Sequence, residues 1–310
     1  VQMSSLKILL GVLMLCGMLF SQEKAIPLWG ETVPNNRAGG TPEVWDTTNA
    51  IRVSQVRKPL LEMYLPDPAI ATGQTVVIFP GGGYKYVVID KEGSKIAKML
   101  NAEGIAAAVV LYRLPDEKNS VIPFESPLMD AARAVRLVRS RAAAWKLDPG
   151  RIGVMGFSAG GHLAASFATQ WQNLKGPLGD AIDRESARPD FAVLMYPVIT
   201  MKEDFMHRGS RDNLLGENPA PALVERFSPE LCVGENTPPA LLIHAGDDRA
   251  VPVENSLVFY QALIRKGIAA EMHLYPVGGH GFGLAPDFRG QTVSAWPQRC
   301  VEWLKMQGRP

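Results

Sequence analysis

The stretch "RIGVMGFSAGGHLAA", residues 151–165, decides the fold because it joins a strand-like segment to a helix-like one through a serine turn. An apolar run precedes Ser158, small residues follow it, and Gly156 and Gly160 flank it in the pattern G-x-S-x-G. The pattern alone arises by chance in roughly one chain of this size in ten, so its setting between strand and helix carries the prediction. Such a turn strains the serine backbone at the carboxyl edge of a sheet and leaves room only for flanking glycines. We therefore expect Ser158 to be presented as a nucleophile.

Strand-like and helix-like segments alternate outward from this turn, beginning near residue 60. The central strand candidates are nearly continuous apolar runs, which is typical of strands covered on both faces. The alternation predicts an α/β fold, with a central, mostly parallel sheet flanked by helices. The strand candidates are 60–66, 75–80, 105–114, 151–157, 191–197, 240–246 and 270–276, and the helix candidates lie near 93–103, 127–145, 159–170, 253–266 and 293–307.

A single catalytic domain is predicted over 56–310, after a lead-in segment at 23–55 that is rich in Gly, Pro and Asn and wraps the sheet edge. A polar, Pro-rich segment at about 200–237 interrupts the alternation and contains one short helix candidate, "APALVERF". We interpret it as an insertion between the sixth and seventh strands. Because it leaves the carboxyl edge of the sheet, we expect it to form one wall over the site.

The formal charge of +1, from 32 basic and 31 acidic side chains, provides no basic face for nucleic acid. The densest basic run, 130–148, carries its arginines off an apolar stripe with helical spacing. We expect them to lie on a solvated helix face. These arginines are Arg133, Arg136, Arg139 and Arg141.

The N-terminal segment contains an uncharged apolar run at 8–20. Thirteen residues are too few for a membrane span, which needs about 20, but suit the core of a signal peptide. We expect a signal peptide at 1–22, cut near Ser21 or Gln22, a secreted or periplasmic protein, and no membrane span after cleavage. A structural helix and a poor lipoprotein signal, "LMLCG", are the alternatives. Export would permit a disulfide between Cys232 and Cys300, but their spacing leaves the pairing open.

A serine hydroxyl is a weak nucleophile at neutral pH, so it needs a base to remove its proton. The base in turn needs a carboxylate to orient it. His280 lies in the glycine-flanked loop "YPVGGHGFG" after the last strand candidate, where its ring can reach the serine. The carboxylate is Asp247 or Asp248 in "HAGDDRAVP", after the preceding strand. The other four histidines lack such a loop position: His162 lies on the helix after the serine, His244 and His273 lie in strands, and His207 lies in the insertion.

The glycine run in "VVIFPGGGYKY", residues 76–86, lets the backbone approach a ligand closely. A phosphate is excluded because neither G-x-x-x-x-G-K-[ST] nor G-x-G-x-x-G is present there. The remaining interpretation is an oxyanion hole, with backbone donors at Gly82, Gly83 and Ala159. Tyr84 follows the glycines and is predicted to close a small acyl pocket, with a plain packing role as the equal alternative.

These motifs resemble the α/β-hydrolase superfamily over about 55–307. More narrowly, "LDPGRIGVMGFSAGGHLAA", "TPPALLIHAGDDRAVPVENSLVFYQAL" and "GGHGFGL" are similar to secreted bacterial acetyl xylan esterases, in the feruloyl and acetyl xylan esterase-like group. The D-x-x-V-P ending of such enzymes implies that Asp248 is the triad carboxylate and that Asp247 braces the turn. Pro80 stands where relatives carry the histidine of H-G-G-G, which leaves the backbone donors in place.

The resemblance implies a serine carboxylesterase that removes acetyl groups from carbohydrate, in particular from acetylated xylan or xylo-oligosaccharides, through an acyl-serine. A general short-chain carboxylesterase or a feruloyl esterase is the alternative. A prolyl-oligopeptidase-like peptidase and a non-catalytic binding protein fit less well, because the lead-in is too short for a propeller domain and all three triad positions are filled. No cofactor is expected, no metal site is indicated by ligand spacing, and the oligomeric state is not predicted.

Overall fold

The computed structural model describes residues 21–22, 25–202 and 204–308. The predicted signal peptide therefore lies outside the described residues except for its last two positions. These form β1 (Ser21–Gln22), which pairs antiparallel with β5 (Leu60–Leu65). The short β2 (Ile26–Pro27) of the lead-in also pairs with β5, so the lead-in follows the sheet edge as predicted.

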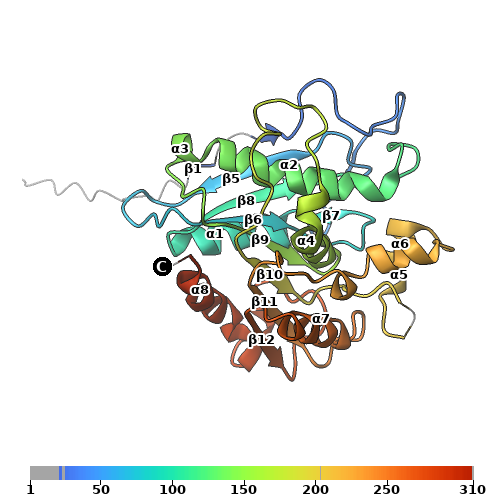
Figure 1. The fold of residues 1–310 in the computed structure, drawn as a ribbon. Helices are drawn as coiled ribbons and strands as arrows, with labels where there is room; N and C mark the ends of the chain where they lie inside the picture. The colour runs from blue at the N-terminus through green and yellow to red at the C-terminus, as the bar shows by residue number, and fades with distance from the viewer. Residues whose placement is uncertain (1–20, 23–24, 203, 309–310) are drawn as a thin grey trace, which may run out of the picture.

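The described part of the chain forms a nine-stranded main sheet in the order β1-β5-β8-β6-β9-β10-β11-β12, with β2 beside β5 (Figure 1). Neighbours from β8 to β12 run parallel, and only the pairs that involve β5 are antiparallel. All seven predicted strands and the mostly parallel sheet are confirmed. Beyond β5, the long strands are β6 (Thr75–Phe79), β8 (Ala106–Leu111), β9 (Ile152–Phe157), β10 (Ala192–Met195), β11 (Ala240–Ala245) and β12 (Ala270–Tyr275).

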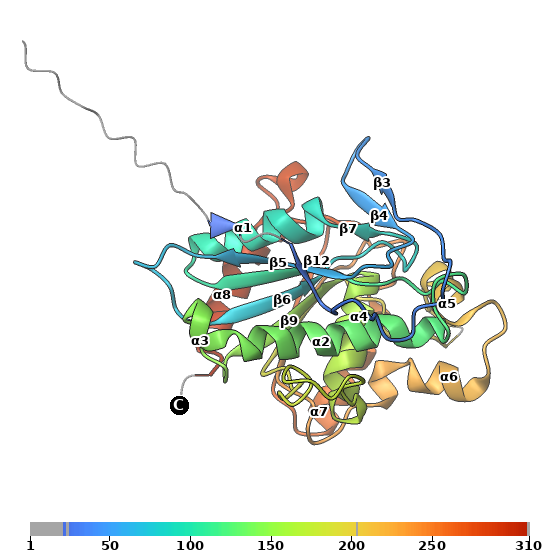
Figure 2. The same cartoon turned by 90° about the horizontal axis from the view of Figure 1, so that it is seen from above.

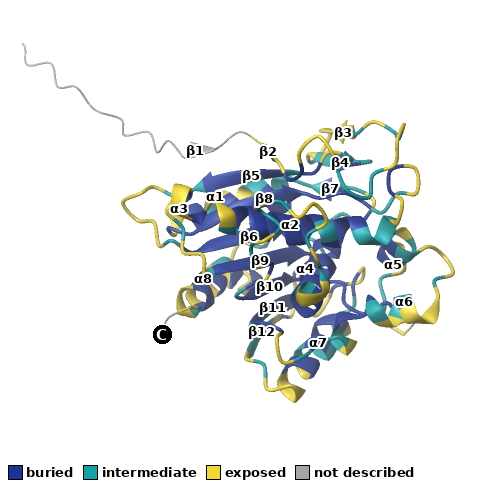
Figure 3. Ribbon diagram, turned by 45° about the horizontal axis from the view of Figure 1, so that its top comes forward, coloured by how far each residue is buried: buried dark blue, intermediate teal, exposed yellow. Residues whose placement is uncertain are grey.

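Helices cover both faces of this sheet, and its central strands are buried (Figures 1 and 3). Successive side chains of a strand point to opposite faces. Val77 of β6 accordingly packs in one core with α2, α4 and α7, and Val76 packs in the other core with α1 and α8. The helices are α1 (Lys95–Ala102), α2 (Ser126–Ser140), α3 (Ala142–Trp145), α4 (Ala159–Gln170), α7 (Glu254–Arg265) and α8 (Trp296–Met306).

Two of the arginines on α2 are buried, which contradicts the prediction that these arginines lie on a solvated helix face. Arg133 is 3% exposed and pairs with Asp180 at 2.6 Å and Asp183 at 2.7 Å. Arg136 is also buried and donates to two backbone carbonyls of the segment 174–185. This segment covers the side of α2 that the helical pattern marks as polar, so the prediction was wrong there. It holds for Arg141, which is exposed.

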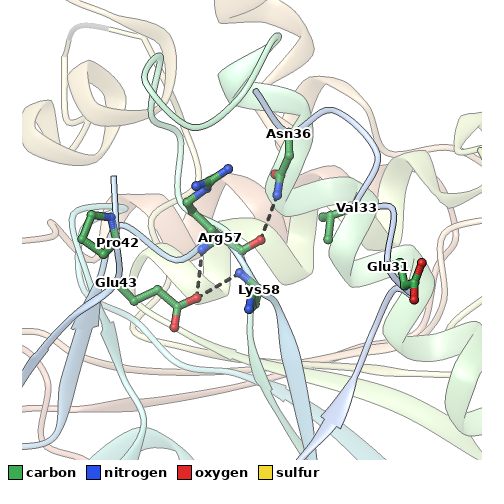
Figure 4. Close-up of a pocket in the computed structure, with 7 residues that line it drawn as sticks. All are labelled: Glu31, Val33, Asn36, Pro42, Glu43, Arg57 and Lys58. Atoms are coloured by element: carbon green, nitrogen blue, oxygen red, sulfur yellow. Dashed lines mark hydrogen bonds between the residues drawn. The ribbon is translucent and has the colours of Figure 1, made fainter. Parts of the chain in front are cut away.

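Two strands of the lead-in, β3 (Val44–Asp46) and β4 (Arg52–Ser54), form a second, three-stranded sheet with β7 (Val87–Val88) of the catalytic domain (Figure 2). A hollow of about 490 Å³ lies where the lead-in joins the domain (Figure 4). Glu43 accepts hydrogen bonds there from the backbone N–H groups of Arg57 and Lys58. None of the predicted site residues lines this hollow.

The insertion contains α6 (Pro221–Arg226), as predicted, and also α5 (Arg208–Leu215), which was not predicted. It lies between β10 and β11, the fifth and sixth of the seven long strands in chain order, one place earlier than expected. Cys232 in this segment and Cys300 on α8 are both free thiols. No helix in the described ranges is both long enough and apolar enough to cross a membrane.

Candidate active site

Ser158 lies at the sharp turn between β9 and α4, with φ of +52°. A Cβ added at Gly156 would lie 2.1 Å from the backbone oxygen of Gly160, and one added at Gly160 would lie 2.1 Å from that of Phe79. Such contacts are impossible for real side chains, so both flanking positions require glycine. The predicted turn is therefore present, with its serine at the carboxyl end of a central strand.

The structure brings Ser158, His280 and Asp248 together. Ser158 Oγ lies 2.8 Å from His280 Nε2, and His280 Nδ1 lies 2.6 Å from Asp248 Oδ2. Because Nδ1–H donates to the carboxylate, Nε2 is left to accept the proton of the serine hydroxyl. The order of contacts is the one that converts a serine into a nucleophile.

The carboxylate of Asp248 is held in its charged form. Burial alone would raise the pKa of Asp248, but hydrogen bonds from His244 and His280 outweigh it and keep the pKa well below its usual range. His244 Nε2 lies 3.2 Å from Oδ2, while the backbone N–H groups of Ala250 and Val251 donate to Oδ1. A fixed, ionised Asp248 suits the task of orienting His280.

Asp247 has a different role from its neighbour. Its Oδ1 accepts hydrogen bonds from the backbone N–H groups of Gly278 at 2.9 Å and Gly279 at 2.8 Å. These two glycines directly precede His280. Asp247 therefore braces the histidine loop, in agreement with the expectation from the sequence.

The glycine loop borders the same site. Gly82 has φ of +137° and Gly83 has φ of +63°, and both line a pocket with Ser158. A Cβ on Gly82 would lie 2.0 Å from the backbone oxygen of Tyr86, so only glycine fits there. The third predicted donor, Ala159, is the first residue of α4 and is buried.

Tyr84 takes the packing role rather than the pocket role. Its side chain is 3% exposed and its hydroxyl lies 2.8 Å from His162 Nδ1. It is not among the residues that line the pocket, whereas Tyr86 and Lys85 are. His162 is itself buried on α4, and its Nε2 donates to the backbone oxygen of Phe227. It is thus the packed helix residue that the sequence predicted.

The pocket over Ser158 has a volume of about 320 Å³. One wall is the glycine loop with the residues after it, and the opposite wall is the insertion, as predicted. Asn213 of α5 joins the two walls, because its Nδ2 donates to the backbone oxygen of Gly83 at 2.8 Å. The lining residues are Gly82, Gly83, Lys85, Tyr86, Val88, Glu92, Ser158, His207, Gly209, Asn213 and His280.

Sequence reasoning missed two titratable groups in this pocket. Glu92 accepts hydrogen bonds from the N–H of Gly81 and the hydroxyl of Tyr196, both at 2.8 Å. Burial raises the pKa of Glu92, although these hydrogen bonds and nearby His280 oppose the shift. His207 was set aside because it lies in the insertion, and no motif marks Glu92.

The sequence profile of the BD-FAE family matches residues 61–263, which include Ser158 and Asp248. The chain belongs to the BD-FAE family. This match covers more than half of the sequence and extends from β5 into α7.

Several known proteins are similar to this chain. An acetylxylan esterase of Xylanibacter ruminicola is 35% identical over 82% of this chain, and the chain spans about half the length of that curated relative. A crystal structure of an acetyl ester-xyloside bifunctional hydrolase from Caldicellulosiruptor lactoaceticus is 39% identical, with a TM-score of 0.77 and coverage of 93% of this chain and 98% of that chain. An alpha/beta hydrolase enzyme from a Medee basin deep-sea metagenome library has 27% identity and a TM-score of 0.60, over 86% of this chain and 97% of its own. The fold is thus that of the α/β-hydrolases.

Proposed function

We propose that the protein is a serine carboxylesterase that removes short acyl groups, above all acetyl, from carbohydrate of the acetylated xylan type. The observation that carries this proposal is the contact series from Ser158 Oγ through His280 to Asp248, with distances of 2.8 and 2.6 Å, in which Ser158 and His280 line a pocket. Ester hydrolysis through an acyl-serine is the chemistry that this series serves.

In the proposed reaction Ser158 Oγ attacks the ester carbonyl while His280 Nε2 takes up the hydroxyl proton. Asp248 keeps the imidazole in position and balances its charge. The tetrahedral intermediate collapses, and His280 returns the proton to the departing alcohol oxygen. Water, activated by the same histidine, then attacks the acyl-serine and releases the carboxylic acid.

The backbone N–H groups of Gly82, Gly83 and Ala159 are the proposed donors to the oxyanion. The N–H of the neighbouring Gly81 already donates to Glu92, which leaves the next two residues of the loop as the candidate donors. The assignment of Ala159 is supported by its position in the first turn of α4, where the N–H groups have no helical partner. Removal of one such donor typically costs about 3 kcal/mol of transition-state stabilisation.

The size of the pocket and the polar side chains in its lining favour a small, hydroxylated substrate. Its volume of about 320 Å³ lies near the lower limit of ligand pockets, which is about 300 Å³. Val88 is the only aliphatic side chain among the described residues that line it, and the rest are polar, aromatic or glycine. One similar protein is named an acetylxylan esterase and another an acetyl ester-xyloside bifunctional hydrolase, which favours an acetylated xylan-type substrate here.

A panel of esters tests the proposal. Acetate release from acetylated xylo-oligosaccharides is measured beside p-nitrophenyl esters from acetyl to octanoyl, a feruloyl ester and a proline-containing peptide. We expect acetate release and a steep fall in kcat/KM beyond butyryl. A preference for octanoyl, feruloyl or peptide substrates, or no acetate from the oligosaccharides, would refute the assignment.

We also propose that the protein is exported, on the basis of the apolar run at 8–20. Expression with the full leader, followed by fractionation and N-terminal sequencing of the product, tests this. We expect a mature protein outside the cytoplasm that begins near residue 22. A full-length product in the cytoplasmic fraction would contradict export.

A further inference from the structure

His207 lies in the pocket but outside the contact series of Ser158, and it forms the N-cap of α5. Its Nδ1 accepts a hydrogen bond from the backbone N–H of Ser210 at 3.2 Å and lies 2.8 Å from the hydroxyl oxygen of Ser210. Histidine is an unusual cap, since Ser, Thr, Asp and Asn are the preferred residues at this position. An imidazole there offers a second nitrogen that those side chains lack.

The cap fixes the tautomer of this ring. Because Nδ1 accepts from a backbone N–H, the proton of the neutral imidazole resides on Nε2. Burial, with a contribution from nearby His280, lowers the pKa of His207, so the ring is neutral at neutral pH. Among the described residues Nε2 has no hydrogen-bond partner, which leaves an N–H donor at the pocket wall.

The position of His207 relates it to one half of the ester. His280 must return its proton to the departing oxygen, so the alcohol half of the substrate lies against His280. His207 lines the same pocket as Ser158 and His280. A donor on His207 can therefore meet the alcohol half of a bound ester.

We infer that His207 Nε2–H donates a hydrogen bond to a hydroxyl of the alcohol half, next to the ester, and so selects polyol and sugar esters over esters of plain alcohols. This rests on the proposed esterase function and names a specificity-determining residue within it. Lys85 and Asn213 lie in the same pocket lining and add further polar groups to it.

Two esters that differ only in the hydroxyls of the alcohol test the inference. Glycerol monoacetate and n-propyl acetate share the acetyl group and a three-carbon alcohol. In His207→Asn the side chain still caps α5, because asparagine is a preferred cap, but the ring donor is lost. Glu217→Ala is the matched control, since Glu217 is exposed in the same insertion and lies outside the pocket.

We expect His207→Asn to lower kcat/KM for glycerol monoacetate about two- to tenfold more than for n-propyl acetate, mainly through KM, as for a lost neutral hydrogen bond. The same loss is expected for acetylated xylo-oligosaccharides, and no change of the ratio in Glu217→Ala. Equal losses on the two small esters, or no loss, would overturn the inference. Wild-type protein that hydrolyses the small esters but releases no acetate from the oligosaccharides would instead refute the proposed substrate, and the ratio for the small esters would still decide the role of His207.

Discussion

Glu92 accepts a hydrogen bond of 2.8 Å from the hydroxyl of Tyr196, and both side chains are buried. The other oxygen of Glu92 accepts from the N–H of Gly81. The ring of Tyr196 packs edge-on against His280, with 5.2 Å between the ring centres, and its oxygen accepts from the N–H of Gly283. One buried pair thus links the glycine loop to the histidine loop.

Tyr196→Phe tests the contribution of this link. The change leaves a carboxylate oxygen of Glu92 and the N–H of Gly283 without a buried partner. Each such loss costs about 1–3 kcal/mol, so we expect the free energy of unfolding to fall by about 2–6 kcal/mol and kcat to be lower. Urea denaturation and steady-state kinetics measure the two effects. Tyr260→Phe, a partly buried tyrosine packed at the other core, is the control. Equal effects of the two changes would contradict the role of the link.

The two adjacent aspartates give opposite predictions. Asp248→Asn removes the charge that holds His280 and favours the wrong tautomer, so we expect kcat to fall by about 10³ to 10⁴. Asp247→Asn keeps an amide oxygen that can still accept from Gly278 and Gly279, so a severalfold loss is expected at most. Kinetics of both variants with p-nitrophenyl acetate check this, and a reversed order would overturn the assignment of Asp248.

His162 predicts a dependence of stability on pH. Burial lowers the pKa of His162 from its ordinary 6.5 to about 4. Between these values the unfolded chain binds a proton that the folded protein does not. Stability is therefore complete above pH 6.5 and is lost as the pH falls toward 4, by ~3 kcal/mol.

Urea denaturation of the wild type and of His162→Gln between pH 4 and 7 isolates this contribution. Glutamine can donate and accept but does not titrate, so we expect the difference in unfolding free energy between the two proteins to shrink as the pH falls. If the unfolding free energies of the two proteins change in parallel with pH, His162 does not contribute to the pH dependence of stability.

Arg133→Ala is expected to be strongly destabilising. It removes the partner of Asp183, whose side chain is 2% exposed, and an unpaired buried charge costs about 3–5 kcal/mol. Arg141→Ala, just after α2, removes an exposed charge that lies over the Trp145 ring, 5.6 Å from its centroid, and should cost about 1 kcal/mol or less. Thermal and urea unfolding compare the two, and similar losses would argue against a structural role for Arg133.

The strands of the fold were predictable because continuous apolar runs such as 75–79 and 152–157 leave few other structures open. The burial of Arg133 was not predictable. The spacing of apolar residues in a helix reveals the face that packs on the core, but it does not reveal that a loop distant in the sequence covers the opposite face. Helix α5 was also missed, since "RGSRDNLL" includes a glycine and little apolar sequence. Its cap, His207, is not one of the preferred cap residues, and the burial of Leu214 depends on tertiary contacts.

The site divides in the same way. Ser158 and His280 lie in local motifs whose geometry follows from their glycines, and the structure brings them together as expected. The sequence could not place Tyr84, because its φ of +59° and its contact with His162 depend on how the loop folds back. Glu92 reaches the pocket from the turn before α1, and no spacing in the sequence relates it to Gly81 or Tyr196.

The most direct measurement of the central proposal is the rate of acetate release from acetylated xylo-oligosaccharides by the wild type and by Ser158→Ala, side by side at equal concentration. The removed hydroxyl is the proposed nucleophile, so we expect steady release by the wild type and a rate at least about 10³-fold lower for the variant, with unchanged thermal unfolding. Release by the variant at a rate close to that of the wild type would contradict the account, as would the absence of release by both proteins.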